Sequence, residues 1–347
     1  MSSVRASVLV SAACAALAVP ALAAAQFTVP TSGTATGFDW TTFPLGPTDS
    51  PSAIASAFGL LWVPDTTTGS GQLSTVDPAT GAVTAQYTPA GAPRGSSILA
   101  QGNDVWIAGP RNQGARVIAV DQTGTTRLTF NGPVKSSLAW GGYPGVGLAY
   151  GAGAIWVSDQ NANRVYAISP TTGRLIRTIT VPAPRSVAVS GKTVWVTNSR
   201  ALQVTMFNAS NGKRVAVGSA KTDPGVMATA NGTMWVFGEN VITGFSLKTL
   251  KQTTTVRIPG FGGASGWAGV VNVNGTLWLS NYVASVMAFN PATRTVTTQG
   301  YWSNSDFAGG ITSANGSLWV ADGSTYAFPL GFGVTRITPT PAPAPAA

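Results

Sequence analysis

The stretch Trp156-Val157-Ser158-Asp159 places a tryptophan in a short apolar segment that ends on a small acidic residue. The same motif recurs at Trp62, Trp106, Trp195, Trp235, Trp278 and Trp319. The residue three positions after each of these tryptophans is a small acid, an amide or a glycine. The intervals between the seven tryptophans are 44, 50, 39, 40, 43 and 41 residues. A repeat of this length is one supersecondary unit that cannot bury its apolar faces alone. The sequence therefore predicts an array of repeats that pack on one another.

The repeat from Arg185 to Asp223 shows how each unit is built. Four short runs rich in β-forming residues are separated by turn residues, so we expect four strands, called a to d in chain order. They span residues 186–189, 193–197, 203–207 and 214–218. In three other repeats an Asn-Gly pair joins strands a and b, and such a pair tolerates the positive φ that a two-residue hairpin turn requires.

The segment 37–45 precedes the first repeat and alternates apolar with polar residues, as a strand does. It has no blade of its own. We expect it to complete the last blade, which starts at Gly309, because pairing the two ends of the chain removes the exposed edges of an open array. The prediction is an all-β chain that forms a seven-bladed β-propeller of four-stranded antiparallel blades over residues 26–337.

The repeats also resemble those of a known superfamily. Repeats such as IWVSDQNANRVYAISPTTGRLIRTITVP, at 155–182, are similar to those of YVTN-type and streptogramin-lyase-like seven-bladed β-propellers. The resemblance covers roughly residues 38–337 and implies the propeller fold, whereas the superfamily contains binding proteins, scaffolds and enzymes. Streptogramin lyase chemistry depends on histidine with acidic metal ligands, and this chain has no histidine. This chain therefore departs from the streptogramin lyases at a residue type that their chemistry requires.

The two ends of the chain indicate export. Residues 1–25 read as a signal peptide, with Arg5 before an apolar run and small residues before Gln26. Cleavage would remove Cys14, the only cysteine, together with the only candidate membrane segment, so we expect a secreted or periplasmic protein without disulfides or thiol chemistry. Residues 338–347 alternate Pro with other small residues and are predicted to form an extended, disordered tail.

The absence of histidine weighs against most hydrolytic and lyase mechanisms, because histidine is the commonest general base near neutral pH and the commonest metal ligand. Glu239, the single glutamate, has no evident partner in the sequence and is not assigned a catalytic role. The net charge of +9 is compatible with anionic polymers, acidic lipids or nucleic acid, or simply with solubility. The charges form no long run, and we expect no nucleic-acid partner.

In a four-stranded blade, the d-to-a and b-to-c connections lie on the same face of the ring, which we call the loop face. A basic sector is predicted there from five residues: Arg94, Arg111, Arg116, Lys135 and Arg185. Cations of this kind bind carboxylate, sulfate or phosphate groups. The alternative is a solvated rim that keeps the protein soluble.

Aromatic residues outside the repeat phase also fall near d-to-a connections: Trp140, Tyr143, Phe261, Trp267, Tyr301, Trp302 and Phe307. Blade packing does not need them. Flat aromatic surfaces with a polar edge are common at interfaces and sugar sites. The alternative is that these residues fold inward and anchor the loops.

A third set occupies the position three residues after each repeat tryptophan, where Asp65, Asp159 and Asp322 are acidic. A ring of oxygen ligands could hold a hard cation such as calcium. The alternative, which we favour, is that these side chains form Asx turns that open the b-to-c hairpin.

Taken together, the sequence predicts a monomeric, non-catalytic propeller whose loop face binds a glycan, an anionic polymer or a protein partner, without a cofactor. Two alternatives remain open. One is a metal-dependent lyase or lactonase-like enzyme that uses Asp65, Asp159 and Asp322. The other is a structural module of a cell surface or wall, which the Pro-Ala tail suggests.

Overall fold

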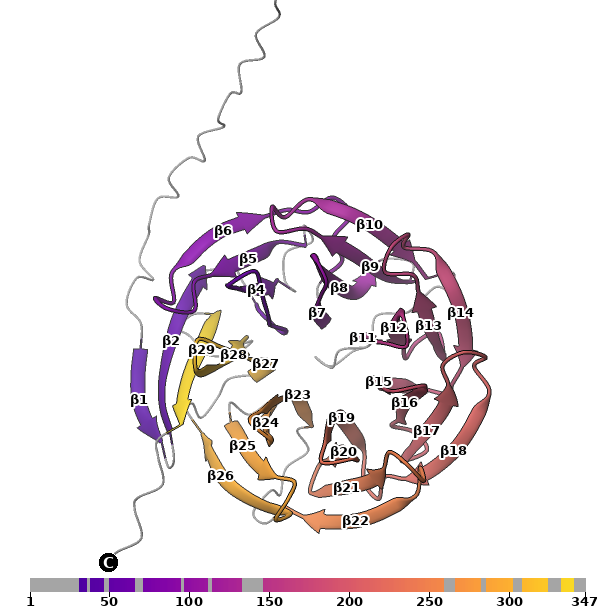
Figure 1. Ribbon diagram of the computed structural model, residues 1–347. Coiled ribbons are helices and arrows are strands. Elements are labelled where there is room, and N and C mark those ends of the chain that lie inside the picture. Colours follow the sequence, from indigo (N-terminus) through magenta and orange to yellow (C-terminus); the bar gives the residue numbers. More distant parts are fainter. Residues whose placement is uncertain are drawn as a thin grey trace, which may run out of the picture.

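The computed structural model describes residues 31–35, 38–46, 50–65, 71–94, 97–111, 114–132, 146–258, 266–281, 285–301, 308–323 and 332–339. Its strands form seven antiparallel sheets arranged as a ring around a central axis (Figure 1). The described residues contain strands and turns but no helix, and hence no helix with the length and apolarity to span a bilayer. The predicted seven-bladed β-propeller is confirmed.

Six blades have four strands, and neighbours along the chain are neighbours in the sheet. The first blade consists of β3 (Ala55–Ala57), β4 (Leu60–Pro64), β5 (Leu73–Val76) and β6 (Val83–Tyr87). The second consists of β7 (Ser97–Gln101), β8 (Asp104–Arg111), β9 (Gly114–Val120) and β10 (Thr126–Asn131). The third consists of β11 (Val146–Gly151), β12 (Ala154–Asp159), β13 (Arg164–Ile168) and β14 (Leu175–Thr180).

The next three blades repeat this order. The fourth consists of β15 (Pro184–Ser190), β16 (Thr193–Asn198), β17 (Gln203–Asn208) and β18 (Arg214–Ser219). The fifth consists of β19 (Pro224–Ala230), β20 (Thr233–Gly238), β21 (Val241–Ser246) and β22 (Gln252–Arg257). The sixth consists of β23 (Trp267–Val273), β24 (Thr276–Asn281), β25 (Ser285–Asn290) and β26 (Thr295–Tyr301).

The seventh blade joins the two ends of the described chain. Its strands β27 (Ala308–Ala314), β28 (Ser317–Asp322) and β29 (Phe332–Pro339) are completed by β2 (Phe38–Gly46), which pairs with β29 along its length. The predicted closure by residues 37–45 is therefore confirmed. The last strand reaches Pro339, two residues beyond the predicted end of the propeller, and residues 1–25 and 340–347 lie outside the described residues.

A fifth strand of this blade, β1 (Thr31–Ala35), was not predicted. It pairs with the outer side of β2, from Thr31 opposite Thr42 to Ala35 opposite Phe38. Its sequence TSGTA has no alternation of apolar and polar residues, which is the signal that marks a half-buried strand. Main-chain pairing on an edge that is already in place needs no such pattern.

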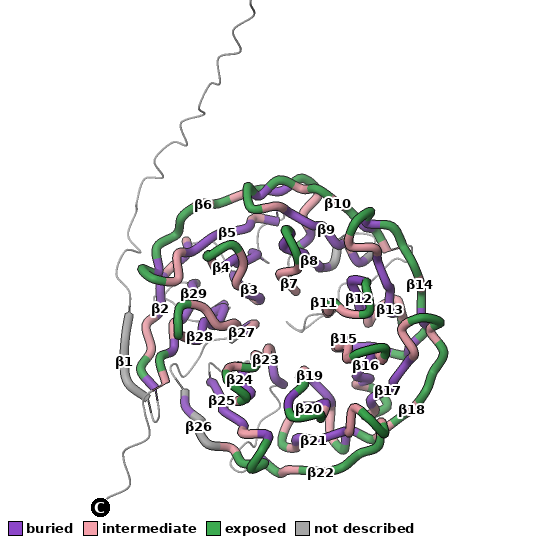
Figure 2. The backbone as a smooth tube through the Cα atoms, in the orientation of Figure 1, coloured by how far each residue is buried: buried purple, intermediate pink, exposed green. Residues whose placement is uncertain are grey.

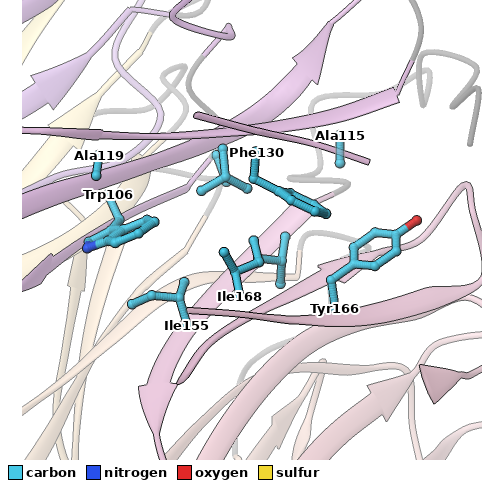
Figure 3. Packing of buried hydrophobic residues seen from close by; sticks show 10 residues of the cluster. Trp106, Ala115, Ala119, Phe130, Ile155, Tyr166 and Ile168 are labelled. Atoms are coloured by element: carbon cyan, nitrogen blue, oxygen red, sulfur yellow. The ribbon is translucent and has the colours of Figure 1, made fainter. Parts of the chain in front are cut away.

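The core lies between neighbouring blades. All seven repeat tryptophans are buried, and each contributes to an apolar cluster between facing sheets. Figure 3 shows the cluster between the second and third blades, where Trp106 lies beside Ile155 and the ring of Phe130 lies 5.5 Å from that of Tyr166. Burial of this kind explains why the tryptophan recurs once per blade.

Candidate functional site

The strand registers place the predicted loop face on one side of the ring. In the fourth blade Pro184 pairs with Asn198, Asn198 with Gln203 and Gln203 with Ser219, so the d-to-a and b-to-c connections lie at the same end of the sheet. The residue three positions after a repeat tryptophan lies there as well, opposite the start of strand a. The same pairing recurs in the fifth blade, where Pro224 lies opposite Gly238.

A cavity of about 230 Å³ lies where the central channel opens on the loop face. It is lined by residues at the start of the seven inner strands β3, β7, β11, β15, β19, β23 and β27 or just before them. Arg185 is the one charged residue of this lining and Trp267 the one aromatic residue. One member of the predicted basic sector and one member of the predicted aromatic set therefore meet at the channel mouth.

Glycines make the mouth narrow. A methyl group on Gly269 would lie 2.7 Å from the backbone nitrogen of Ile311, and one on Gly310 would lie 3.2 Å from Cα of Ala53. The inner strands of neighbouring blades thus approach one another more closely than a side chain at these positions permits. Nine of the lining residues are Gly, Ala or Ser, and the others, apart from Arg185, are larger apolar residues.

Hydroxyl groups join the second strand of one blade to the inner strand of the next blade. Ser158 Oγ donates to the carbonyl of Arg185 at 2.9 Å, and Ser280 Oγ donates to the carbonyl of Gly309 at 2.6 Å. Thr197 Oγ1 makes the corresponding bond to the carbonyl of Gly225 at 3.4 Å. Each hydroxyl stands two residues after a repeat tryptophan. The sequence analysis did not assign this position, although a hydroxyl at a constant offset was visible in three of the seven repeats.

Arg185 is buried rather than part of a solvated rim, with 8% of its surface exposed. Its Nη1 donates to Asp223 Oδ2 at 2.9 Å, and Asp223 lies in the connection between the fourth and fifth blades with 37% of its side chain exposed. The guanidinium also lies against Gly266, where a methyl group would approach Nη2 to 2.8 Å. This packing holds the arginine beside the segment that begins β23.

Trp267 is the first residue of β23, and 2% of its surface is exposed. Its indole Nε1 donates to the carbonyl of Gly238 at 2.7 Å and so ties the sixth blade to the fifth. Tyr301 is the last residue of β26, with a side chain outside the described set. The other predicted aromatic residues lie outside the described residues: Trp140, Tyr143, Phe261, Trp302 and Phe307.

Of the other predicted cations, Arg94 and Arg116 are described with their side chains, and neither lines the cavity. Arg94 is exposed just before β7, and Arg116 lies on β9, where its Nη1 donates to the carbonyl of Gly91 at 2.9 Å and its Nε to Asn131 Oδ1 at 2.8 Å. Arg111 ends β8 with a side chain outside the described set, and Lys135 lies outside the described residues.

The acidic residues three positions after the repeat tryptophans are buried hydrogen-bond acceptors. The Asp159 carboxylate accepts the backbone N–H of Asn161, two residues on, as in an Asx turn, and its Oδ1 accepts the N–H of Ala162 at 3.0 Å. Asp65 Oδ1 accepts the N–H of Ser50 at 3.0 Å. Asp322 Oδ2 accepts the hydroxyl of Thr335 at 2.9 Å. Burial raises the pKa of the Asp159 carboxyl, and three backbone N–H groups oppose the rise.

The three acids belong to three different blades. Within the described residues, no three His, Cys, Asp or Glu side chains are grouped closely enough to hold a metal ion. Calcium binding stays a prediction of the sequence. In the structure these carboxylates terminate hairpins and join segments that are distant in the chain.

No family model and no curated protein matches this sequence. Solved structures do match its fold. U3-55K has a TM-score of 0.67 at 11% identity, with 87% of this chain and 98% of that chain covered. The WD40 repeats of RRP9 have a TM-score of 0.67 at 10% identity, with 90% and 99% covered. BamB from Moraxella catarrhalis has a TM-score of 0.57 at 13% identity, with 89% and 100% covered. Likeness at such low identity shows the fold alone.

Proposed function

We propose that the protein is an exported, non-catalytic binding propeller that holds an anionic ligand or partner group at the channel mouth of its loop face. The observation that carries this proposal is the convergence of Arg185 and Trp267 on one cavity lined by all seven blades. The propeller fold, shared with WD40-repeat proteins and BamB, is consistent with a binding or scaffold role. The resemblance of the repeats to YVTN-type propellers supports the same role.

The size of the cavity limits what enters it. Sites that enclose a whole small molecule have volumes of about 300–1,000 Å³. At about 230 Å³ the channel mouth accommodates one chemical group of a larger ligand, such as a carboxylate or a side chain of a partner. The rest of the ligand would spread over the loop face, as expected for a glycan, an anionic polymer or a protein.

The chemistry of the lining favours an anionic group with an apolar neighbour. A guanidinium presents several N–H donors in a plane and binds carboxylate or phosphate through paired hydrogen bonds. Asp223 occupies Nη1 and holds the group in place. Ile98, Val187, Met227 and Val270 supply apolar surface around it.

The test is an array of glycans, anionic polymers and acidic peptides, probed with the wild type and with Arg185→Gln. Loss of one charge-assisted contact is expected to weaken binding about 10- to 100-fold. Lys192→Gln is the matched control, because Lys192 is an exposed cation in the same blade at the opposite end of its sheet. It is expected to bind as the wild type does.

A second variant tests the same cavity in case Arg185→Gln does not fold. Val226→Phe places a larger side chain at a half-buried position of the cavity lining and leaves the Arg185–Asp223 pair intact. It is expected to weaken the same interaction. The proposal fails if no probe binds, or if both variants bind as the wild type does.

A further inference from the structure

The charge of the protein is concentrated in three neighbouring blades. Residues 164–257, in the third to fifth blades, contain twelve Lys and Arg but only two acids, Asp223 and Glu239, a net charge of +10. The rest of the chain contains eight Lys and Arg and nine acids, a net charge of −1. Among the described residues, Arg185 is the one member of the twelve that forms an ion pair. The other eleven form no ion pair within the described part of the chain, although Arg164 lies opposite Asp159 in the sheet.

Half of the twelve lie on the face opposite the loop face. In the fourth blade Ser190 pairs with Thr193 and Thr193 with Asn208, so the a-to-b and c-to-d turns share one end of the sheet, which we call the turn face. The N–H of Ala209 donates to the carbonyl of Lys192 at 2.8 Å and joins the two turns. The exposed cations of these turns or next to them are Arg174, Lys192, Lys213, Arg214, Lys248 and Lys251. The c-to-d turns of the first and second blades carry Asp77 and Asp121 instead.

Exposed aliphatic side chains adjoin these cations on the outer wall of the ring. Leu175 and Ile176 on β14 are 45% and 53% exposed, and Val215 and Val217 on β18 are 48% and 45% exposed. These four are half of the large apolar residues found exposed in the described part of the chain. Single exposed apolar residues are ordinary, whereas a group on neighbouring strands marks an interaction surface.

The two strands belong to one continuous surface. β14 and β18 are the outer strands of adjacent blades, and both are exposed along the rim of the ring (Figures 1 and 2). Arg177 on β14 donates through Nη2 to the carbonyl of Ser210, in the turn that leads into β18. Arg174 directly precedes Leu175, and Arg214 directly precedes Val215, so charge and apolar surface alternate at the edge between the turn face and the outer wall.

We propose that this edge docks the protein on the surface of an anionic lipid bilayer. The docking edge consists of three cations and four aliphatic residues: Arg174, Lys213, Arg214, Leu175, Ile176, Val215 and Val217. Lys and Arg side chains are attracted to acidic headgroups, and aliphatic side chains beside them enter the boundary between headgroups and acyl chains. A soluble polyanion would use the cations but leave the aliphatic residues in water. The presence of both favours a bilayer.

This surface is independent of the channel mouth. The cavity opens at the loop-face end of the inner strands, whereas the docking edge lies at the turn-face end of the outer strands. A protein held by this edge keeps its loop face accessible to a ligand. Failure of either proposal therefore leaves the other intact.

The experiment is cosedimentation of the purified protein with lipid vesicles. The wild type and every variant are prepared with the same N-terminal residue, so that they differ only at the substituted positions. Vesicles of phosphatidylcholine alone are compared with vesicles of equal parts phosphatidylcholine and phosphatidylglycerol. We expect binding to the anionic vesicles only, with a marked decrease as salt screens the charges. The triple variant Arg174→Gln, Lys213→Gln, Arg214→Gln is expected to reduce the partition coefficient about 100-fold.

A second variant separates a bilayer from a soluble polyanion. Ile176→Thr with Val215→Thr and Val217→Thr keeps the β-forming branched side chains and the charges, and it is expected to reduce vesicle binding about tenfold. The matched control is Val83→Thr with Arg294→Gln, at an outer strand and a c-to-d turn of other blades. This control is expected to bind as the wild type does.

Three results would overturn the proposal. The first is the absence of binding to anionic vesicles at low salt. The second is equal loss of binding in the docking-edge and control variants. The third is an aliphatic variant that binds vesicles as the wild type does while soluble polyphosphate competes fully, which would assign the edge to a soluble polyanion.

Discussion

Ser158, Thr197 and Ser280 each join the second strand of one blade to the inner strand of the next blade. Their partners are backbone carbonyls of the following blade. Ser158 and Ser280 are fully buried, so a carbonyl that lost its donor would find no water in its place. These bonds fix the distance between neighbouring blades beside the cavity. A hydroxyl occupies this position in three of the seven repeats, so the fold does not require it in every blade.

Ser280→Ala is expected to lower the free energy of unfolding by about 1–3 kcal/mol, because it leaves the carbonyl of Gly309 buried and unsatisfied. Denaturant unfolding measures the change. Ser219→Ala, at an exposed serine that ends β18, is expected to change stability by no more than about 0.5 kcal/mol. Equal effects of the two variants would show that the Ser280 bond contributes nothing to stability.

Tyr166 presents the opposite case, because its buried hydroxyl has no hydrogen-bond partner among the described residues. Burial, with a smaller contribution from the Asp159 carboxylate, raises the pKa of Tyr166 to about 12. The unfolded chain loses this proton near pH 10, whereas the folded chain retains it until about pH 12. Stability contributed by the neutral phenol is therefore complete below about pH 10 and declines as the pH rises through that interval.

Tyr166→Phe is expected to raise the free energy of unfolding at neutral pH by about 1 kcal/mol, because it removes a buried hydroxyl without a partner and keeps the ring that packs on Phe130. The advantage of the variant is expected to grow between about pH 10 and pH 12. Urea unfolding of both proteins across this range gives the comparison. A gap that stays constant with pH would contradict the assigned pKa.

In the first four blades the glycine of the c-to-d turn rests on the outer strand of the preceding blade, and the closest of these contacts is where the first blade meets the closing strand. Gly81 has a φ of 75°, and a methyl group there would lie 2.2 Å from the ring of Phe43 on β2. Gly59 has nearly the same φ, 77°, but a methyl group there would meet nothing within 4 Å. Substitution of Gly59 therefore measures backbone strain alone, whereas substitution of Gly81 measures backbone strain together with close packing.

Gly59→Ala is expected to cost about 1 kcal/mol through the left-handed backbone alone. Gly81→Ala adds overpacking against Phe43 and is expected to cost about 3 kcal/mol in total. The midpoints of thermal unfolding of the two variants provide the measurement. If Gly59→Ala proved equally destabilising, the contact with β2 would be irrelevant to stability.

The strands were predictable because each repeat carries its own local signals. In the fourth blade the predicted segments agree with the observed strands to within two residues at each end. The partners of the site residues were not predictable, because Asp223 meets Arg185 from a distance of 38 residues along the chain. The charge of Arg185 suggested a surface role, and only packing against Gly266 and Asp223 reveals its burial. Likewise Trp267 begins a strand rather than standing in the loop before it.

Two strands at the N-terminal end of the ring, β1 and β2, contribute differently to its closure. β2 pairs with β29 and supplies Phe38, Phe43 and Leu45 to the core, whereas β1 pairs only with β2 and forms the outermost strand of the seventh blade. Removal of β2 would leave β29 without its outer neighbour and would uncover the clusters on both sides of the seventh blade.

A chain that begins at residue 37 lacks β1 and is expected to retain a single cooperative unfolding transition with a slightly lower midpoint. A chain that begins at residue 47 lacks β2 as well and is expected to lose that cooperativity and to be cut rapidly by protease. Calorimetry with limited proteolysis distinguishes the two. Cooperative unfolding of the shorter chain would show that the ring holds without its closing strand.

The pairing of β2 with β29 also has a consequence for biosynthesis. The ribosome makes β2 before any of the six complete blades and β29 after all of them, so β2 has no β29 to pair with until every complete blade has been made. Through that interval the chain is an open arc of blades whose two ends are not joined. A ring that closes only by this pairing can pass through a narrow pore as an extended chain and close afterwards.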